Sequence, residues 1–155
     1  MARPACSTLS LTIGTARGTA AIDEAAALYV RSGRVAFAWR APDYFQAEDF
    51  KTFALDEEVW LARLGEAPVG VLSLFRPENF VHCLYVDPDA QRLGVGRALV
   101  AHVRREVGAP LTLKLDVPNR RAVAFYEATG WERMTGLDDQ GIDETGVKWA
   151  RYRLA

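Results

Sequence analysis

Residues 86–107 read VDPDAQRLGVGRALVAHVRREV, and this run says more about the fold than any other part of the chain. It predicts the end of a strand, a tight turn at Gly94 and Gly96, and then an amphipathic helix. The first turn of a helix has unpaired N–H groups and the positive end of the helix dipole, so it attracts anions. Glycines leave that backbone open to a phosphate, and Arg92 and Arg97 add positive charge. An ordinary loop with two turn glycines has the same pattern, so other segments of the sequence must distinguish a phosphate-binding turn from such a loop.

The Q-x-x-G-x-G spacing at 91–96, which follows LYVDP at 84–88, resembles the acyl-CoA pyrophosphate signature of the GNAT superfamily of N-acetyltransferases. It differs from a dinucleotide fingerprint because Leu99 replaces the third glycine, and the chain has no Gly-Lys-Ser/Thr of a P-loop. Residues 118–131, PNRRAVAFYEATGW, are similar to the family's later motif, in which an Asn opens a helix that carries Phe-Tyr. The two motifs occur in the family's order and at its separation.

Apolar periodicity divides the rest of the chain into short strands and amphipathic helices. Helices are expected over residues 19–32, with Gly33 as the C-terminal cap, over 43–55, after Gly94 and after Asn119. Strands are expected over 9–13, 58–64, 69–75, 80–86, 111–116, 131–135 and 147–154, with a long mobile loop over 136–146. No linker interrupts the order, so residues 1–155 are assigned to one domain. The resemblance implies the α/β (α+β mixed) class and the GNAT fold, a central mixed β-sheet of about seven strands flanked by about four helices.

Composition and charge narrow the possible functions. Of the 155 residues, 50% are hydrophobic and 25% are charged, and the formal net charge is −1. Nucleic-acid binding needs an excess of basic residues, so no nucleic-acid partner is expected. Cys6 and Cys83 make no disulfide framework, and no Cys/His group has metal-ligand spacing, so no metal is expected. No apolar run suits a signal peptide or a membrane span, so a cytoplasmic location without a membrane partner is expected.

The resemblance implies acetyl-CoA as the acyl donor. In the family, the strand before the phosphate turn separates from its neighbour, and its backbone bonds the pantetheine arm. The matching residues here are Leu84, Tyr85 and Val86. The turn expected to wrap the pyrophosphate consists of Arg92, Leu93, Gly94, Val95, Gly96 and Arg97. Asn119 matches a cofactor-binding position, and it is equally suited to cap the helix that it opens.

Acetyl transfer to an amine needs an acid for the leaving thiolate and a base for the ammonium group. The resemblance implies that Tyr126 is the acid, although its helical spacing also fits a core aromatic residue. Two glutamate bases of the family are missing. Lys114 stands where ribosomal-protein N-terminal acetylases carry one, which disfavours that substrate class, and Phe80 stands where histone-acetylase-like members do. His82 lies in a His-x-Leu-x-Val pattern similar to arylalkylamine N-acetyltransferases, so it is the candidate base, with a structural role as the alternative.

The acceptor is expected to be a primary amine of a small molecule. By comparison with the family, the substrate contacts are expected from Trp39, Arg40, Tyr44, Phe45, Trp60, Phe75 and Asp139. Acetylation of a protein N-terminus or lysine is one alternative, and it would call for a shallow peptide groove. A non-catalytic acyl-CoA-binding module is another, against which the intact Phe-Tyr pair argues. A homodimer stays possible.

The remaining histidine and cysteine positions are given structural roles. Cys83 is expected in the core, pointing away from His82, because neighbouring strand residues face opposite sides of a sheet. His102 is expected on the solvated face of its helix.

Overall fold

Eight strands and four α-helices dominate residues 10–155, the part of the chain that the computed structural model describes. The strands are β1 (Leu11–Thr15), β2 (Glu58–Leu64), β3 (Ala67–Phe75), β4 (Phe80–Val86), β5 (Leu111–Asp116), β6 (Glu132–Arg133), β7 (Gln140–Ile142) and β8 (Lys148–Leu154). The α-helices are α1 (Thr19–Ala36), α2 (Ala47–Ala54), α3 (Val95–Val107) and α4 (Arg120–Ala128), and short 3-10 turns lie at Pro42–Tyr44, Arg76–Glu78 and Pro88–Ala90.

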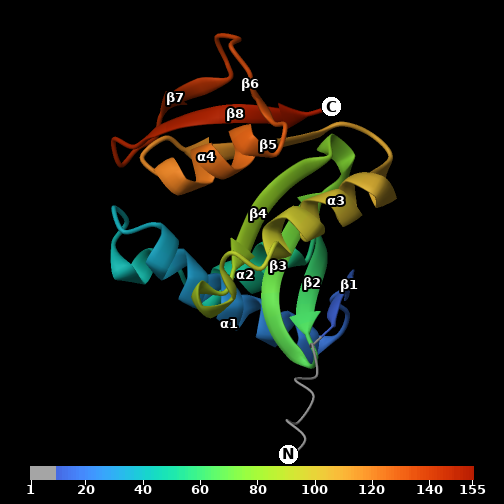
Figure 1. Ribbon diagram of the computed structural model, residues 1–155. Coiled ribbons are helices and arrows are strands. Elements are labelled where there is room, and N and C mark those ends of the chain that lie inside the picture. The colour runs from blue at the N-terminus through green and yellow to red at the C-terminus, as the bar shows by residue number, and fades with distance from the viewer. Residues whose placement is uncertain (1–9) are drawn as a thin grey trace, which may run out of the picture.

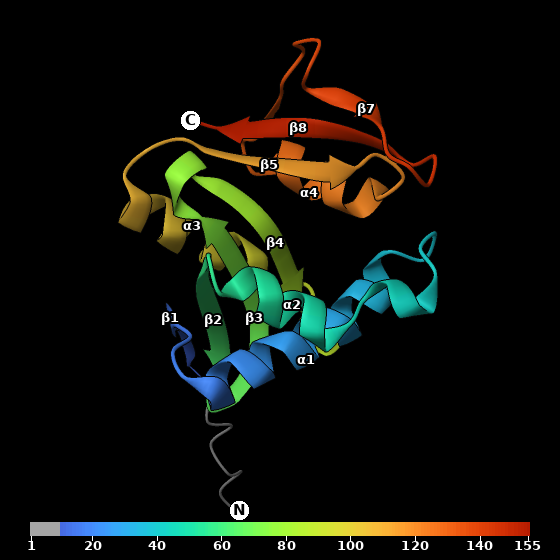
Figure 2. The same ribbon diagram turned by 180° about the vertical axis from the view of Figure 1, so that it is seen from behind.

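The strands form one sheet in the order β1-β2-β3-β4-β5-β8-β6, and β7 pairs with β8 (Figure 1). Every pair is antiparallel except β4 with β5. Helices α3 and α4 lie on the near face in Figure 1, whereas α1 and α2 lie on the near face in Figure 2, which shows the molecule from behind. The expected mixed α/β class is confirmed, with β7 as a strand that the sequence pattern did not predict.

Side chains of the sheet alternate between two hydrophobic cores. Val71 of β3 packs with Leu28 and Phe50 in the core beneath α1 and α2, and Leu72 packs with Leu99 in the core beneath α3 and α4. This alternation follows from the two-residue period of a strand. Strand β3 is therefore buried on both faces and forms the centre of the fold.

Gly33 does not end the first helix, as had been expected, because α1 continues to Ala36. A Cβ atom at Gly33 would lie 2.5 Å from Cδ1 of Phe45, so the glycine makes room for that buried ring. The expected helix over 43–55 is also interrupted. A 3-10 turn ends at Tyr44, Phe45 takes an extended conformation that places its ring in the core, and α2 begins only at Ala47.

The expected loop over 136–146 contains β7, which pairs with β8 from Gln140 opposite Ala150 to Ile142 opposite Lys148. Gly141 lies beneath Trp149, where a Cβ atom would come within 2.9 Å of the indole ring. The first strand begins at Leu11, and Leu9 lies outside the described residues.

Strands β4 and β5 pair only at their first residues, Phe80 with Thr112 and Val81 with Leu113, and then diverge (Figure 1). The pairing between β3 and β4 also shifts, because Leu74 lies opposite Val81 while Ser73 lies opposite Cys83. His82 is thus the extra residue of a β-bulge. Together the divergence and the bulge shape the site described below.

Candidate active site

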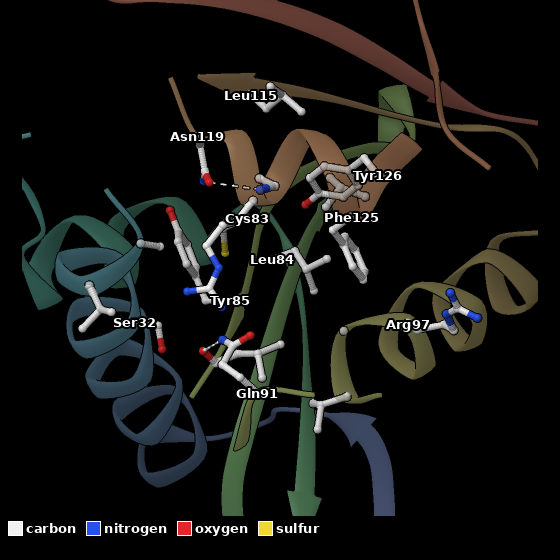
Figure 3. A pocket seen from close by; sticks show the side chains of 18 of the residues that line it. Ser32, Cys83, Leu84, Tyr85, Gln91, Arg97, Leu115, Asn119, Phe125 and Tyr126 are labelled. Carbon is white, nitrogen blue, oxygen red and sulfur yellow. Dashed lines mark hydrogen bonds between the residues drawn. The ribbon is translucent and has the colours of Figure 1, made fainter. Parts of the chain in front are cut away.

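The diverging strands open a cavity of about 670 Å³ (Figure 3). Its walls come from the C-terminal end of α1, from β4 and β5, from the start of α3 and from α4. Leu84, Tyr85 and Val86 line it, on the part of β4 that has no pairing with β5. Backbone N–H and C=O groups on that edge are therefore available to a ligand.

The start of α3 forms one end of the cavity and has the conformation of an anion-binding turn. Gly94 is the N-cap at φ +75°, and Arg92 also takes a left-handed conformation at φ +67°. A Cβ atom on Gly94 would have no neighbour within 4 Å, so the space beside this backbone is open. Alternating left-handed residues at a helix start turn successive N–H groups toward one point, which suits a phosphate.

Gly96 also lines the cavity, but its surroundings are tighter than those of Gly94. A Cβ atom there would lie 3.3 Å from the Phe125 ring and 3.4 Å from a methyl group of Val86. This glycine therefore lets α3 approach β4 and α4 closely, whereas Gly94 supplies the open backbone. Leu93 is 60% exposed and lies outside the lining of the cavity, unlike the other residues expected to bind the cofactor.

Two polar side chains that were not assigned a role hold this turn in place. Gln91 donates from Nε2 to the Val86 carbonyl oxygen at 3.0 Å, a bond drawn in Figure 3. Asp87 accepts from the Asp89 N–H at 2.8 Å and forms an ion pair with Arg31 of α1. An Asp-Pro-Asp sequence is a typical signal for a side chain that caps a short turn, so the bond from the Asp89 N–H to Asp87 could have been predicted.

Asn119 lies at the opposite wall and caps α4, because its Oδ1 accepts from the Ala122 N–H at 3.1 Å. That bond uses the oxygen only, so the Nδ2 group stays available to a ligand in the cavity that Asn119 lines. Arg92, Arg97 and Arg121 also line the cavity, and none of them forms an ion pair within residues 10–155. The start of α3 and its surroundings are therefore positively charged.

Tyr126 lies on α4 with 8% of its surface exposed, and its hydroxyl points into the cavity in Figure 3. Its ring packs edge-on against Phe125 and Trp131, with centroids 5.2 and 5.4 Å away. No hydrogen bond of its hydroxyl is found in the described part of the chain. Burial raises the pKa of Tyr126 above its ordinary value, so the hydroxyl keeps its proton at neutral pH.

His82 lies where the cavity reaches the bulge of β4, and 43% of its side chain is exposed. Its Nδ1 atom is 2.8 Å from Oε1 of Glu57, and its ring centroid is 4.3 Å from that of Phe53 in α2. Cys83 is buried as expected, and burial raises the pKa of its thiol to about 12, so it stays protonated. The expectation that the two side chains face opposite sides was wrong, because the bulge turns His82 toward α2, whose core also contains Cys83.

None of the seven expected substrate residues belongs to the cavity lining, and two of them, Trp60 and Phe75, lie far from its acceptor side. Trp60 is 7% exposed in the core under α3, and its ring centroid is 5.3 Å from that of His102, which is half-buried rather than solvated. Phe75 pairs with Phe80 at the end of β3. Strand alternation turns Trp60 away from the α1 and α2 face, so we do not include it in the site.

Trp39 and Arg40 instead connect distant segments. Arg40 donates from one guanidinium nitrogen to Asp116 at 2.9 Å and to Asp143 at 2.8 Å, and from another to Thr145 at 2.8 Å. The Trp39 indole N–H donates to Asp116 at 3.2 Å. We call these five residues the Arg40 clasp. It ties the segment after α1 to the end of β5 and to the turn between β7 and β8.

The other expected substrate residues have local structural contacts. The exposed Tyr44 ring lies 4.7 Å from the Arg40 guanidinium carbon, and the Phe45 ring is buried. Asp139 accepts from the Gly136 N–H at 2.9 Å and so closes a turn before β7. Within residues 10–155, no group of three or more His, Cys, Asp or Glu residues could hold a metal ion. The helices in that range are all too short or too polar to cross a bilayer.

The sequence profile of the Acetyltransferase (GNAT) family matches residues 20–131, which is more than half of the chain. The chain belongs to the GNAT family of acetyltransferases. It is similar to the peptidyl-lysine N-acetyltransferase YjaB of Escherichia coli K12, at 29% identity over 136 residues, which cover 86% of this chain and 88% of YjaB. It is also 29% identical over 119 residues to the ribosomal protein bS18 alanine N-acetyltransferase of the same strain, covering 73% of this chain and 77% of that enzyme.

Solved GNAT structures share the fold. The solution structure of apo YjaB superposes with a TM-score of 0.72 at 22% identity, covering 94% of this chain and 97% of YjaB. The PaiA N-acetyltransferase of Thermoplasma acidophilum, solved in complex with coenzyme A, gives a TM-score of 0.75 at 14% identity and covers 92% of this chain and 98% of its own. The protein is therefore a GNAT N-acetyltransferase, and acetyl-CoA is the acyl donor of this family.

Proposed function

We propose that this GNAT enzyme transfers the acetyl group of acetyl-CoA to the primary amine of a small molecule by direct attack. The observation that carries the proposal is the continuous cavity between β4 and β5. It combines an unpaired strand edge, an open helix start and a buried tyrosine hydroxyl.

The donor side of the cavity suits a long ligand with a charged end. The start of α3 offers N–H groups to a pyrophosphate, and Gly94 leaves them uncovered. The free edge of β4 at Leu84, Tyr85 and Val86 can bond the amide groups of a pantetheine arm in the way that a neighbouring strand would. The arginines that line the cavity without ion-pair partners favour bound phosphate.

Tyr126 is the proposed acid. When the amine nitrogen forms a bond to the acetyl carbon, the carbon–sulfur bond breaks and the sulfur keeps the electron pair. The Tyr126 hydroxyl donates its proton to that sulfur. The new amide nitrogen loses its surplus proton to solvent, and Tyr126 then recovers a proton from solvent. Burial holds the phenol in its protonated form, and the same burial would raise the pKa of a thiol beside it, so the site disfavours a free thiolate as well as a phenolate.

His82 is the proposed base for the acceptor. It borders the cavity at the point where β4 leaves β5, and it points toward α2, away from α4 and Tyr126. An imidazole can take a proton from an ammonium group and return it to solvent near neutral pH. The opposed positions of acid and base suit attack by an amine that approaches from the α1 and α2 face.

The contacts around this face support a compact acceptor. Phe37 and Tyr85 line the cavity, with ring centroids 5.8 Å apart, and form an aromatic wall. The Arg40 clasp bridges the segment after α1 and the end of β5, so this face is less open than a peptide groove would be. A second candidate is a lysine side chain of a protein, which the similarity to YjaB favours.

The test measures CoA release from acetyl-CoA with matched acceptors. A set of arylalkylamines and alkylamines would be compared with a lysine-containing peptide and with a peptide that has an N-terminal alanine. We expect a higher kcat/KM for the free amines than for either peptide. A preference for the lysine peptide would replace the small-molecule acceptor with the second candidate, and no turnover with any amine would refute both.

A further inference from the structure

Glu57 is a buried acidic residue to which the proposed transfer assigns no role. It follows α2 in the run Asp56-Glu57-Glu58, and its side chain is only 7% exposed. Its Oε1 atom lies 2.8 Å from Nδ1 of His82. Its Oε2 atom is buried and has no hydrogen-bond partner among the described residues. A buried carboxylate is costly unless a partner compensates its charge, so the contact with His82 is important for both groups.

The surroundings of His82 make Glu57 its only ion-pair partner in the described range. From α2, the Phe53 ring packs against the imidazole and carries no charge. On the same strand, the neighbouring Cys83 thiol is buried and protonated. On β5, Lys114 and Asp116 are the titratable side chains of the face toward α1 and α2. The Lys114 ammonium group lies over an aromatic ring of β8 at 4.2 Å, and Asp116 is paired with Arg40. The charge that acts on the imidazole at contact distance is therefore negative.

A hydrogen bond to a carboxylate fixes which imidazole nitrogen carries the proton. With Nδ1–H donated to Oε1 of Glu57, the lone pair of the neutral ring lies on Nε2. No hydrogen bond of Nε2 is found in residues 10–155, and the side chain is 43% exposed where it borders the cavity. The nitrogen able to accept a proton is thus the one left free for substrate or water.

We propose that Glu57 is a positioning residue that holds His82 with Nδ1 protonated and Nε2 free, so that Nε2 takes the proton from the acceptor ammonium group. This inference rests on the proposed acetyl transfer. The proton moves from the acceptor nitrogen to Nε2, directly or through one water, and the amine keeps the electron pair with which it attacks. The Nδ1 proton stays in its bond to Glu57, whose negative charge stabilises the imidazolium ion. His82 then returns the extra proton to solvent.

The experiment compares Glu57→Gln with a matched control, Glu58→Gln, in the full-length protein. Glu57→Gln keeps the size of the side chain and an oxygen acceptor but removes the charge. Glu58 is the next residue and pairs with Arg76 at 2.8 Å, away from the imidazole. The chain has two histidines, so proton NMR of the imidazole C–H signals reports on each, with His82→Ala as the assignment. The pH profile of kcat/KM is measured in parallel.

We expect Glu57→Gln to move the NMR titration curve of His82 to lower pH, because the imidazolium ion loses its counter-charge. The signal of His102, which packs against Trp60, and both signals in Glu58→Gln should stay in place. The acidic limb of kcat/KM should move in the same direction, with a loss of about ten-fold at neutral pH, against about 10²-fold or more for His82→Ala. Glu57→Asp, which retains the charge but retracts it, should give an intermediate curve if the Gln variant fails to fold.

The two readouts separate the failure of this inference from that of the proposed function. An unchanged His82 titration curve in a folded Glu57→Gln variant would overturn the positioning role of Glu57, whatever the activity. If the His82 titration curve shifts but the pH profile of kcat/KM does not, the ion pair with Glu57 is supported and the role of His82 as the base is overturned. If no amine is turned over, acetyl transfer itself is refuted, and the NMR result still reports on the pair.

Discussion

Replacement of Tyr126 by phenylalanine tests the proposed acid without disturbing the packing around it. The ring stays between Phe125 and Trp131, and only the hydroxyl that points into the cavity is removed. If that hydroxyl protonates the leaving thiolate, its loss should lower kcat by about 10²-fold or more. A factor of 10² corresponds to about 2.7 kcal/mol of transition-state stabilisation.

The expected effect of Tyr126→Phe on folding is much smaller. The hydroxyl has no hydrogen bond within residues 10–155, so its removal leaves no protein group unpaired, and the free energy of unfolding should change by less than about 1 kcal/mol. Tyr152 provides the matched control. It is 2% exposed in β8, and its hydroxyl donates to Oε1 of Glu127 at 3.2 Å, outside the cavity. Tyr152→Phe should therefore lose about 1 kcal/mol of stability and keep its turnover.

The assays are CoA release with a thiol reagent, CoA affinity by calorimetry and thermal unfolding, applied to both variants. We expect opposite effects in the two variants. Tyr126→Phe should lose turnover but not stability, whereas Tyr152→Phe should lose stability but not turnover. CoA affinity should be unchanged in both. A Tyr126→Phe variant that turns over at the wild-type rate would refute the acid role and leave Tyr126 as a core aromatic residue.

Three further changes test other parts of the structure. Gly96→Glu should weaken CoA binding in calorimetry, because it crowds the junction of α3 with α4 and brings negative charge to the phosphate site, and unchanged affinity in a folded variant would contradict that site. Gly33→Ala should lower Tm, because overpacking against Phe45 costs about 1–3 kcal/mol and helix propensity returns at most about 1 kcal/mol, whereas a raised Tm would show that the ring can move. Hydrogen bonds, first of all from the Thr145 side chain, hold the pKa of Asp143 below its ordinary value of 3.8. The stabilisation by Asp143 is therefore present at neutral pH and lost as the pH falls below that value, so Asp143→Asn should flatten the acid side of a Tm-against-pH curve, and an unaltered curve would count against it.

Elements that end at glycine or proline were predicted closely from the sequence. Strands β4 and β5 have the expected bounds, and α3 begins after Gly94 as expected, with Gly108 as its C-cap. Proline at Pro88 and Pro110 cannot donate a backbone hydrogen bond, and left-handed glycines end helices, so these boundaries depend on local chemistry alone. The residues expected around the phosphate turn come together for the same reason, since they are consecutive in the chain.

The features that the sequence did not predict depend on contacts between distant residues. Gly33 resembles a helix cap in the sequence, but its role is set by Phe45, which reaches it from the next segment. The bulge at His82 depends on how β3 pairs with β4, and the residue pattern along β4 alone does not show where an extra residue is inserted. Glu57 lies in an acidic run that is typical of a solvated turn, and only the fold brings it to the imidazole. The side chains that accept hydrogen bonds from the Arg40 guanidinium group are 76 to 105 positions away in the chain.

The divergence of β4 from β5 gives the enzyme a slot whose two sides differ in stiffness. On the side of α3 and α4, one continuous apolar core joins the two halves of the sheet. Closely packed side chains of this kind cannot shift without opening a cavity or creating a steric clash. On the side of α1 and α2, the Arg40 clasp joins them through ion pairs and hydrogen bonds, which water can replace. We therefore expect the thioester to be held at constant geometry while the opening for the amine widens or narrows. Changes in the few polar side chains of the clasp would then alter which amines enter, without rebuilding the part of the molecule that holds the donor.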